Sequence, residues 1–439
     1  MRLHSTPAKG TADFATSILA IFVLVIGLQA QPGEAAGTGG RNAPDKAETP
    51  YLILISIDGF AWDYLSIYPT PALDRIARTG VRAASLRPVF PSLTFPNHYS
   101  IATGLYPSEH GIVHNHFPDA AREGWYHLWD RQSVEDGRWY GGEPIWVQAE
   151  KNGLVAAAYY FVGTEAAIAG VSPSYWHSFD ASVPGSDRVA QVIRWLEMPA
   201  ENRPHLITLY FEHVDTAGHN FGRGSPELAA AVETVDADIG RLLDGIGELG
   251  LSGDVYLLVV SDHGQANYVN SETTFVLREH IDLDGLEITA GGAYAWIYLQ
   301  QPDPDRARAI RDTINERWTH GRAVLREEAP PEWRIGDSPR FPEIFVVPEP
   351  GYGVVVEREA VQRLKKGDHG WEPSAKAMHG IFLAAGPGLP RGETIDEVSA
   401  VELYPLMLEI LQIEAPALAS DRDRLRSLVD LDGRVHAPR

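Results

Sequence analysis

Apolar runs that end in acidic residues constrain the fold of this chain most strongly. Residues 51–57 (YLILISI) stop at Asp58, and residues 254–261 (DVYLLVVS) stop at Asp262. A further run spans residues 205–211 (HLITLYF). Unbroken apolar and β-branched runs of this length are typical of strands buried on both faces, as in a parallel sheet. The runs therefore predict a sheet whose strands lead into polar loops at one edge.

Helical patterns alternate with these strands. Residues 70–80 (TPALDRIARTG) begin with Thr70 as an N-cap and Pro71 at the first helical position. Strand, helix, strand order favours an α/β fold with a mostly parallel central sheet and helices on both faces. The other elements expected on this ground are a strand at 155–161, helices at 187–197 and 226–249, a strand at 380–385 and a closing helix within 398–413.

Residues 265–365 break this alternation. They combine expected strands at 293–299, 343–347 and 354–357 with one helix at 304–317 and a proline-rich loop. We interpret them as a smaller α+β insertion within one catalytic domain that spans residues 51–415. Residues 416–439 are then a C-terminal tail.

The first 50 residues have the composition of a targeting segment. Arg2 and Lys9 precede the apolar run 15–28, and small and polar residues follow it. This is the three-part form of a secretory signal, which predicts a signal peptide at 1–30 cleaved near Ala30 or Ala36; an uncleaved anchor is the alternative. Residues 31–50 are predicted to be a flexible leader. The mature protein is expected to be exported, periplasmic or secreted, with no membrane span.

Composition excludes some chemistry. The chain has no cysteine, so thiolate metal sites and thiol nucleophiles are excluded, and any metal must be held by His, Asp, Glu or hydroxyl oxygen. The formal net charge of −22 argues against binding a nucleic-acid polymer through a broad basic face. The charge of a small anionic substrate would have to be met by cations bound in the site.

Potential metal ligands follow the predicted strands. Asp58 ends the first strand, Asp215 and His219 follow the strand at 205–211, and Asp262 and His263 end the strand at 254–261. Ligands of an open parallel sheet bind at the carboxyl ends of its strands, so these side chains are expected to meet. His and Asp are suitable zinc ligands, and the set predicts a two-metal centre with ions roughly 4 Å apart.

One of the two sites still lacks an imidazole. The candidates are His369 in the Gly-flanked turn GDHG and His379 in MHG. His379 begins an apolar strand and is expected to be packed. We favour His369, because a polar turn before the last core strand can reach over the sheet edge.

Thr94 has two interpretations. Pro91 and Pro96 bracket it, and the apolar spacing that follows predicts a helix starting near residue 94. A helix N-terminus suits phosphate, and zinc can activate a hydroxyl oxygen by lowering its pKa. Thr94 is therefore either an ordinary N-cap or a nucleophile.

The motifs together resemble one family. Residues 91–115 (PSLTFPNHYSIATGLYPSEHGIVHN), with DG at 58–59, DTAGH at 215–219, SDHG at 261–264 and GDHG at 367–370, are similar to the nucleotide pyrophosphatase/phosphodiesterases of the alkaline phosphatase superfamily. The resemblance covers most of residues 51–415. It implies an alkaline-phosphatase-like fold and two Zn²⁺ ions per chain. It also implies hydrolysis of nucleotide phosphodiester and pyrophosphate bonds through a phosphothreonine.

The resemblance also assigns roles to residues. It implies that Thr94 is the nucleophile and that Asn115 donates to a nonbridging phosphoryl oxygen. It further implies that Phe95 and Tyr210 line a base pocket. It implies one zinc site made of Asp215, His219 and His369, and a second made of Asp58, Asp262, His263 and Thr94.

Other functions remain open at this stage. A sulfatase needs a modified cysteine or serine where this chain has threonine. A phosphomonoesterase of the alkaline phosphatase type would favour an added Arg or Lys near the phosphate, and residues 163–168 (GTEAAI) offer none. A choline-lipid phosphodiesterase of the same family and an inert metal-binding protein are further alternatives. The sequence does not predict the oligomeric state.

Overall fold

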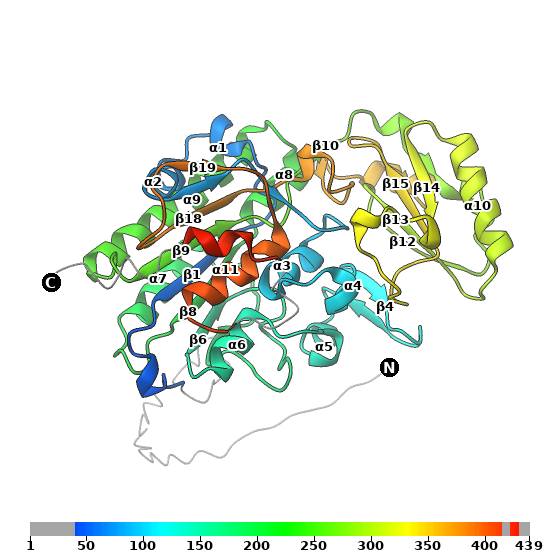
Figure 1. The fold of residues 1–439 in the computed structure, drawn as a ribbon. Coiled ribbons are helices and arrows are strands. Elements are labelled where there is room, and N and C mark those ends of the chain that lie inside the picture. Colours follow the sequence, from blue (N-terminus) through cyan, green and yellow to red (C-terminus); the bar gives the residue numbers. More distant parts are fainter. Residues whose placement is uncertain (1–39, 415–421, 430–439) are drawn as a thin grey trace, which may run out of the picture. The chain divides into compact units, whose positions relative to one another are not determined.

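The computed structural model describes residues 40–414 and 422–429 (Figure 1). The predicted signal peptide at 1–30 lies outside the described residues. The main sheet of the described chain has the strand order β19-β2-β18-β9-β1-β8-β6-β7. Its strands are β1 Tyr51–Ile57, β2 Val81–Ala83, β6 Ala156–Tyr159, β7 Tyr175–His177, β8 Leu206–Phe211, β9 Val255–Val260, β18 Phe382–Ala385 and β19 Glu393–Ile395.

The centre of this sheet is parallel. β1 lies between β8 and β9, in the registers Ile57↔Phe211 and Ser56↔Val260. β6 and β7 continue the parallel set on one side. On the other side β18 runs antiparallel to β9 and to β2. The carboxyl ends of β1, β8 and β9 therefore share one edge with the amino end of β18.

Helices cover both faces, which confirms the predicted α/β class. Leu52 and Leu54 face one core cluster, while Ile53 and Ile55 face the other. The first cluster packs against α3 Thr94–Thr103, α6 Ile145–Lys151 and α11 Leu403–Ile410. The second packs against α2 Pro71–Thr79, α7 Gly185–Leu196, α8 His213–Phe221 and α9 Pro226–Glu248. Because both faces of the strand are covered, every residue of β1 is buried.

A second sheet forms within the predicted insertion. Its antiparallel order is β12-β13-β15-β14, with strands Leu286–Ala290, Ala295–Leu299, Ile344–Pro348 and Gly321–Leu325, and α10 Pro304–Arg317 packs on it. The aromatic ring of Phe90 stacks on Trp333 at 4.0 Å between centroids, which ties the insertion to the main body. At its base, β10 Ala266–Asn267 pairs antiparallel with β17 Gly367–Asp368. We call this pair the stem.

The remaining elements are short. The helices are α1 Tyr64–Ile67, α4 Pro107–His110 and α5 Arg131–Val134. The strand pairs are β3 Leu86–Arg87 with β20 Val398–Ser399, β4 His116–Pro118 with β5 Trp125–His127, and β11 Phe275–Val276 with β16 Val354–Val355. No helix of the described ranges is long and apolar enough to cross a membrane.

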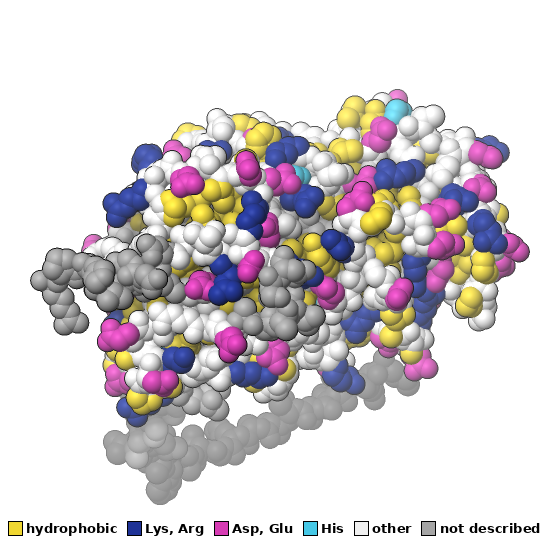
Figure 2. All heavy atoms as spheres, in the orientation of Figure 1, with side chains coloured by type: hydrophobic (Ala, Val, Ile, Leu, Met, Phe, Trp, Pro, Cys, Tyr) yellow, Lys and Arg dark blue, Asp and Glu magenta, His cyan; other side chains and the backbone are white. Residues whose placement is uncertain are grey.

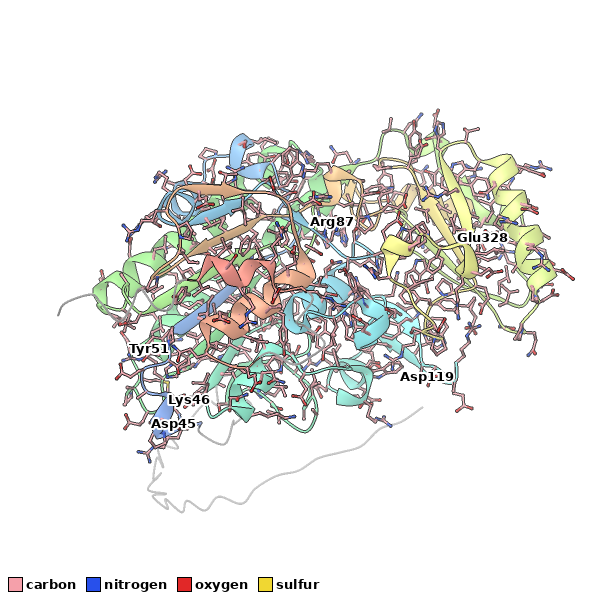
Figure 3. The ribbon with its side chains drawn as sticks, in the orientation of Figure 1. Asp45, Lys46, Tyr51, Arg87, Asp119 and Glu328 are labelled. Carbon is pink, nitrogen blue, oxygen red and sulfur yellow. The ribbon has the colours of Figure 1, made fainter. Side chains whose placement is uncertain are left out.

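The ordered fold extends beyond the expected domain limits at both ends. Asn42 is buried and its side-chain amide donates to the carbonyls of Ala200 and Arg203, although residues 31–50 were expected to be a flexible leader. Asp45 and Lys46 lie at the same end of the fold as Tyr51 (Figure 3). Within the expected tail, residues 424–428 form a 3-10 helix that buries Leu425. Hydrogen bonding and burial, rather than composition, decide these limits.

Charges of both signs are mixed over the face shown in Figure 2. Lys and Arg side chains there are interspersed with Asp and Glu, and they do not merge into a broad basic surface.

A buried ion pair fixes the carboxyl end of β8. The guanidinium of Arg188, on α7, is fully buried and donates to both carboxylate oxygens of Glu212, at 2.6 and 2.7 Å. It also donates to the carbonyl of Tyr210. Removing one partner of a buried pair leaves an uncompensated charge and typically costs about 3–5 kcal/mol. We expect Arg188→Ala to lower the unfolding free energy by about this amount in urea titrations. Arg194→Ala, at an exposed position of α7, should change it by less than about 0.5 kcal/mol.

Candidate metal centre and nucleophile

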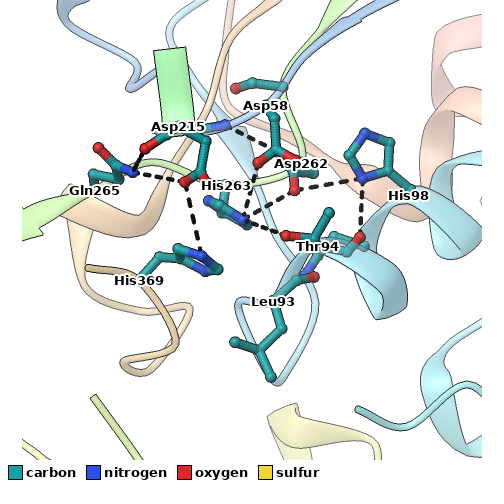
Figure 4. Close-up of polar contacts among 12 residues, drawn as sticks. Asp58, Leu93, Thr94, His98, Asp215, Asp262, His263, Gln265 and His369 are labelled. Carbon is teal, nitrogen blue, oxygen red and sulfur yellow. Dashed lines mark hydrogen bonds and ion pairs between the residues drawn. The ribbon is translucent and has the colours of Figure 1, made fainter. Parts of the chain in front are cut away.

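Two neighbouring strand ends bring two carboxylates and one imidazole together. Asp58 follows β1, Asp262 and His263 follow β9, and all three side chains are buried. The Nε2 atom of His263 lies 3.0 Å from Asp262 Oδ2 and 3.4 Å from Asp58 Oδ1 (Figure 4). The backbone N–H of Gly59 donates to Asp262 Oδ1 at 3.2 Å. The predicted second group of ligands therefore converges.

The other predicted group lies beside it. Asp215 and His219 stand four residues apart on α8, with His219 Nε2 3.2 Å from Asp215 Oδ2. The Nε2 atom of His369 lies 3.8 Å from Asp215 Oδ1. The ring of His369 stacks on that of His263, with centroids 3.6 Å apart. His369 reaches this edge because β18 is antiparallel, so the turn before it ends at the same edge as β1 and β9.

The three imidazoles share one hydrogen-bonding pattern, with Nδ1 at a backbone carbonyl. The Nδ1 atoms of His219, His263 and His369 lie 2.8–3.0 Å from the backbone carbonyls of Gly367, Gly264 and Ser92, respectively. Donation from Nδ1 leaves each Nε2 facing the carboxylates. Metal-binding histidines in proteins commonly donate their other ring N–H in this way. The donor set therefore fits divalent metal ions, and zinc in particular.

The electrostatics of the cluster fit bound cations. Burial, with Asp262 and Asp215 nearby, raises the pKa of Asp58 well above its usual range. Burial also opposes ionisation of Asp215, but His219 and His369 outweigh it and lower the pKa of that carboxyl. Carboxylates crowded in one buried site repel each other, and divalent cations relieve that repulsion.

Thr94 is the first residue of α3 and faces this cluster. Its Oγ1 lies 3.3 Å from His263 Nε2 (Figure 4). The N-cap of α3 is Leu93, whose side chain cannot accept a hydrogen bond, so Thr94 does not cap the helix. The N-cap interpretation is therefore excluded by the position of Thr94. Its hydroxyl lies at a helix N-terminus, an environment that favours anions.

Asn115 approaches the same helix end. Its Oδ1 accepts a hydrogen bond from the N–H of Phe95 at 3.0 Å. Because the amide oxygen is the acceptor in this contact, the Nδ2 group is the hydrogen-bond donor of the Asn115 side chain. Asn115 is thus held against the first turn of α3, beside the residue that follows Thr94.

The two residues expected to line a base pocket have different surroundings. Phe95 contacts the ring of Tyr126 edge to face, at 6.0 Å between centroids. The hydroxyl of Tyr210 instead donates to Asp58 Oδ2 at 2.6 Å, and its ring packs against His98. Tyr210 therefore holds a predicted metal ligand, a contact that the expected base-lining role did not include. Phe179, 6.1 Å from Tyr210 between centroids, is the next aromatic ring outward.

Comparisons with known proteins identify the family. The sequence profile described as type I phosphodiesterase/nucleotide pyrophosphatase matches residues 52–372. The chain belongs to this family. Human ectonucleotide pyrophosphatase/phosphodiesterase family member 1 is 30% identical over 379 residues, which is 85% of this chain and 41% of that protein. Venom phosphodiesterase 2 of Crotalus adamanteus is 29% identical over 402 residues, or 87% and 48% of the two chains. The chain thus spans less than half the length of these curated relatives.

Solved structures agree with this assignment. Murine ectonucleotide pyrophosphatase/phosphodiesterase 5 superposes with a TM-score of 0.80 at 27% identity, covering 87% of this chain and all of that one. The same murine protein is also known in an inactive threonine-to-alanine form in complex with AMP. The fold of this phosphodiesterase-family chain is therefore the alkaline-phosphatase-like α/β fold that the sequence predicted.

Two neighbours of the predicted metal ligands in this phosphodiesterase-family chain were not predicted from sequence. Gln265 Nε2 donates to Asp215 Oδ1 at 2.6 Å, and a Cβ at Gly218 would lie only 1.6 Å from Gln265 Oε1. His98 lies 3.4 Å from Asp262, but its Nδ1 contacts the carbonyl of Thr94 and its Nε2 contacts Ser56 Oγ. Both ring nitrogens of His98 are engaged, so it is a neighbour of the centre and not a free ligand. The only signal in the sequence was nearness to SDHG and to Thr94.

His379 lies away from this centre. Its Nε2 contacts the carbonyl of Pro373 at 2.9 Å, and its Nδ1 contacts Ser85 Oγ at 3.0 Å and Glu397 at 3.2 Å. Burial lowers its pKa to about 4. These contacts agree with the expectation that His379 is packed.

Proposed function

We propose that this protein is a zinc-dependent phosphodiesterase that hydrolyses nucleotide phosphodiester and pyrophosphate bonds through a phosphothreonine. The observation that carries the proposal is the position of Thr94. Its hydroxyl lies at the N-terminus of α3, 3.3 Å from Nε2 of His263, which belongs to one of three groups of potential metal ligands among the described residues. The names of the relatives, a nucleotide pyrophosphatase/phosphodiesterase and a venom phosphodiesterase, support the same chemistry.

Some residues of the chain would bind the zinc ions, and others orient these ligands or react with the substrate. Asp215, His219 and His369 would hold one zinc ion, and Asp58, Asp262, His263 and Thr94 the other. When bound, such ions lower the pKa of hydroxyl and water oxygens and neutralise phosphoryl charge. Tyr210 and Gln265 orient Asp58 and Asp215 by hydrogen bonds.

The reaction then proceeds in two displacements at phosphorus, the first by Thr94 and the second by water. The Thr94 oxygen forms a bond to phosphorus as the bond to the leaving oxygen breaks, and the electron pair departs with that oxygen. The hydroxyl proton passes to solvent. Asn115 donates from Nδ2 to a nonbridging oxygen while negative charge develops there. Water then attacks the phosphothreonine and releases the nucleoside monophosphate and Thr94.

We further propose that the protein is exported. The pattern at 1–30 has the form of a secretory signal, and the relatives include venom enzymes. Periplasm or the exterior is then the site of action.

A comparison of phosphate esters tests the proposed class. A nucleoside 5′-monophosphate nitrophenyl ester should be cleaved at least about 10-fold faster, in kcat/KM, than nitrophenyl phosphate. Asn115 offers one donor, and among the described residues no Lys or Arg side chain contacts Thr94 or Asn115 to meet the added charge of a dianion. The assay would also include nitrophenyl phosphocholine. Faster cleavage of the monoester would favour a phosphatase, and faster cleavage of the phosphocholine ester would favour the choline-lipid activity.

A further inference from the structure

A lysine lies at the outer end of the candidate metal centre. The Nζ atom of Lys365 is 2.9 Å from His219 Nε2 and 3.6 Å from Asp368 Oδ1, and its side chain is 48% exposed. Among the residues that the structure describes, no other Lys or Arg side chain lies within hydrogen-bonding distance of the predicted zinc ligands. The ammonium group of Lys365 therefore lies at the edge of a site whose other titratable groups are carboxylates and imidazoles.

The backbone beside Lys365 is anchored by hydrogen bonds, whereas the Lys365 side chain is partly exposed. The N–H of Lys366 donates to the carbonyl of His219 at 2.9 Å, and Gly367 and Asp368 form one strand of the stem. The carbonyl of Gly367 also accepts from His219 Nδ1. A metal ion on His219 Nε2 would displace the ammonium group from that nitrogen. The anchored backbone would then keep the ammonium at the mouth of the centre.

Lys365 and Thr94 occupy opposite ends of the cluster. Contacts run in sequence from Thr94 to His263, from His263 to the stacked ring of His369, from His369 to His219, and from His219 to Lys365. In an in-line displacement the leaving group departs on the side of phosphorus opposite the nucleophile. The leaving group would therefore point toward Lys365, while Asn115 contacts the phosphoryl oxygens at the Thr94 end.

We propose that Lys365 binds a phosphate of the leaving group and selects substrates cleaved at a pyrophosphate bond. This inference rests on the proposed phosphodiesterase function and specifies its substrate class. For a nucleoside triphosphate, the Thr94 oxygen forms a bond to the α-phosphorus, the bond to the bridging oxygen breaks, and diphosphate leaves with the electron pair. Net hydrolysis consumes one water and yields nucleoside monophosphate, diphosphate and a proton. An uncharged or aromatic leaving group would gain nothing from the ammonium.

Paired substrates test the proposal. We expect Lys365→Ala to lower kcat/KM for ATP about 10- to 100-fold, the range for loss of one charge-assisted hydrogen bond, and to change kcat/KM for the nitrophenyl ester of AMP less than 3-fold. Lys365→Arg should restore most of the loss. Lys366→Ala is the matched control, because this neighbouring exposed lysine makes no side-chain contact with the cluster among the described residues, and it should leave both substrates unaffected.

A binding measurement provides a readout besides turnover. In zinc-loaded protein carrying Thr94→Ala, adding Lys365→Ala should weaken ATP binding about 10- to 100-fold by calorimetry and AMP binding less than 3-fold. Zinc content should equal that of the parent. An equal loss for ATP and the nitrophenyl ester, or a loss of zinc, would show that Lys365 only supports His219 and would overturn the proposal. A fall in kcat/KM confined to nitrophenyl phosphate would show that Lys365 contacts the transferred phosphoryl group, and this result would also overturn the proposal. Absence of diester hydrolysis by the wild-type protein would instead contradict the proposed function.

Discussion

Replacement of Thr94 by alanine is expected to remove nearly all diesterase turnover, by about 10⁴- to 10⁶-fold, as when other enzymes lose their nucleophile. The physical reason is that no other hydroxyl among the described residues stands at the same helix end beside His263. The fold should be preserved, because the N-cap of α3 is Leu93 and the Thr94 side chain makes no capping hydrogen bond. Zinc content should stay close to that of the wild type, since Asp58, Asp262 and His263 remain.

Thr94→Ser is the matched control for this prediction. It keeps a hydroxyl at the same atom and removes only a methyl group, so turnover should stay within about 100-fold of wild type. Quenching a burst of diester turnover at low pH should leave the nucleoside monophosphate esterified to the threonine or serine protein and none on the alanine variant. Substantial diester turnover by Thr94→Ala would contradict the role of Thr94 as nucleophile.

His369→Ala and His379→Ala are expected to fail in different ways. His369 points its Nε2 at Asp215 and stacks on His263, so its loss should empty one of about two zinc sites per chain and lower turnover by at least about 100-fold. His379 contacts Ser85 and Glu397, so its loss should leave zinc in place and lower the unfolding free energy by about 1–3 kcal/mol.

Atomic emission on freshly purified protein measures the first effect, and urea unfolding measures the second. Chelation of the wild type should abolish turnover, and added zinc should restore it. Loss of zinc from His379→Ala with full zinc in His369→Ala would reverse the assignment. Active protein without any bound transition metal would contradict the metal centre altogether.

Local sequence patterns predicted the central strands of the main sheet, because these are buried on both faces, but they missed the short strands β2, β7 and β19, of which β7 and β19 are partly exposed. The apolar run at 51–57 became β1 at the same bounds, and the helices expected at 226–249 and 304–317 lie at Pro226–Glu248 and Pro304–Arg317. Long-range contacts were not predictable in this way. Thr70 was expected to cap α2, but the cap comes from Asp236 on α9, which accepts from the N–H groups of Ala72 and Leu73.

The site was predictable to the extent that its ligands follow strands. Asp58 and Asp262 come directly after apolar runs, so the sheet alone places them together. Lys365 and Gln265 carry no such signal, because a loop residue is placed by the contacts of its neighbours and not by its own pattern. Tyr210 is a different case. The resemblance implied a role in a base pocket, and the structure adds a hydrogen bond from its hydroxyl to the carboxylate of Asp58.

The stem has a consequence for how such a protein can diversify. β9 leads out of the main sheet and β18 leads back in beside it, in antiparallel register, so the chain between them departs and returns at one edge. The two-residue pairing of β10 with β17 closes that excursion at its base and lies next to Gln265 and His369. Residues beyond the stem that do not pack on the main body, as Trp333 does on Phe90, can therefore be lengthened, shortened or exchanged through evolution while the reacting groups keep their positions. This part of the insertion is replaceable. Grafting the corresponding segment of a relative onto the stem strands β10 and β17 is a direct route to new substrate preferences.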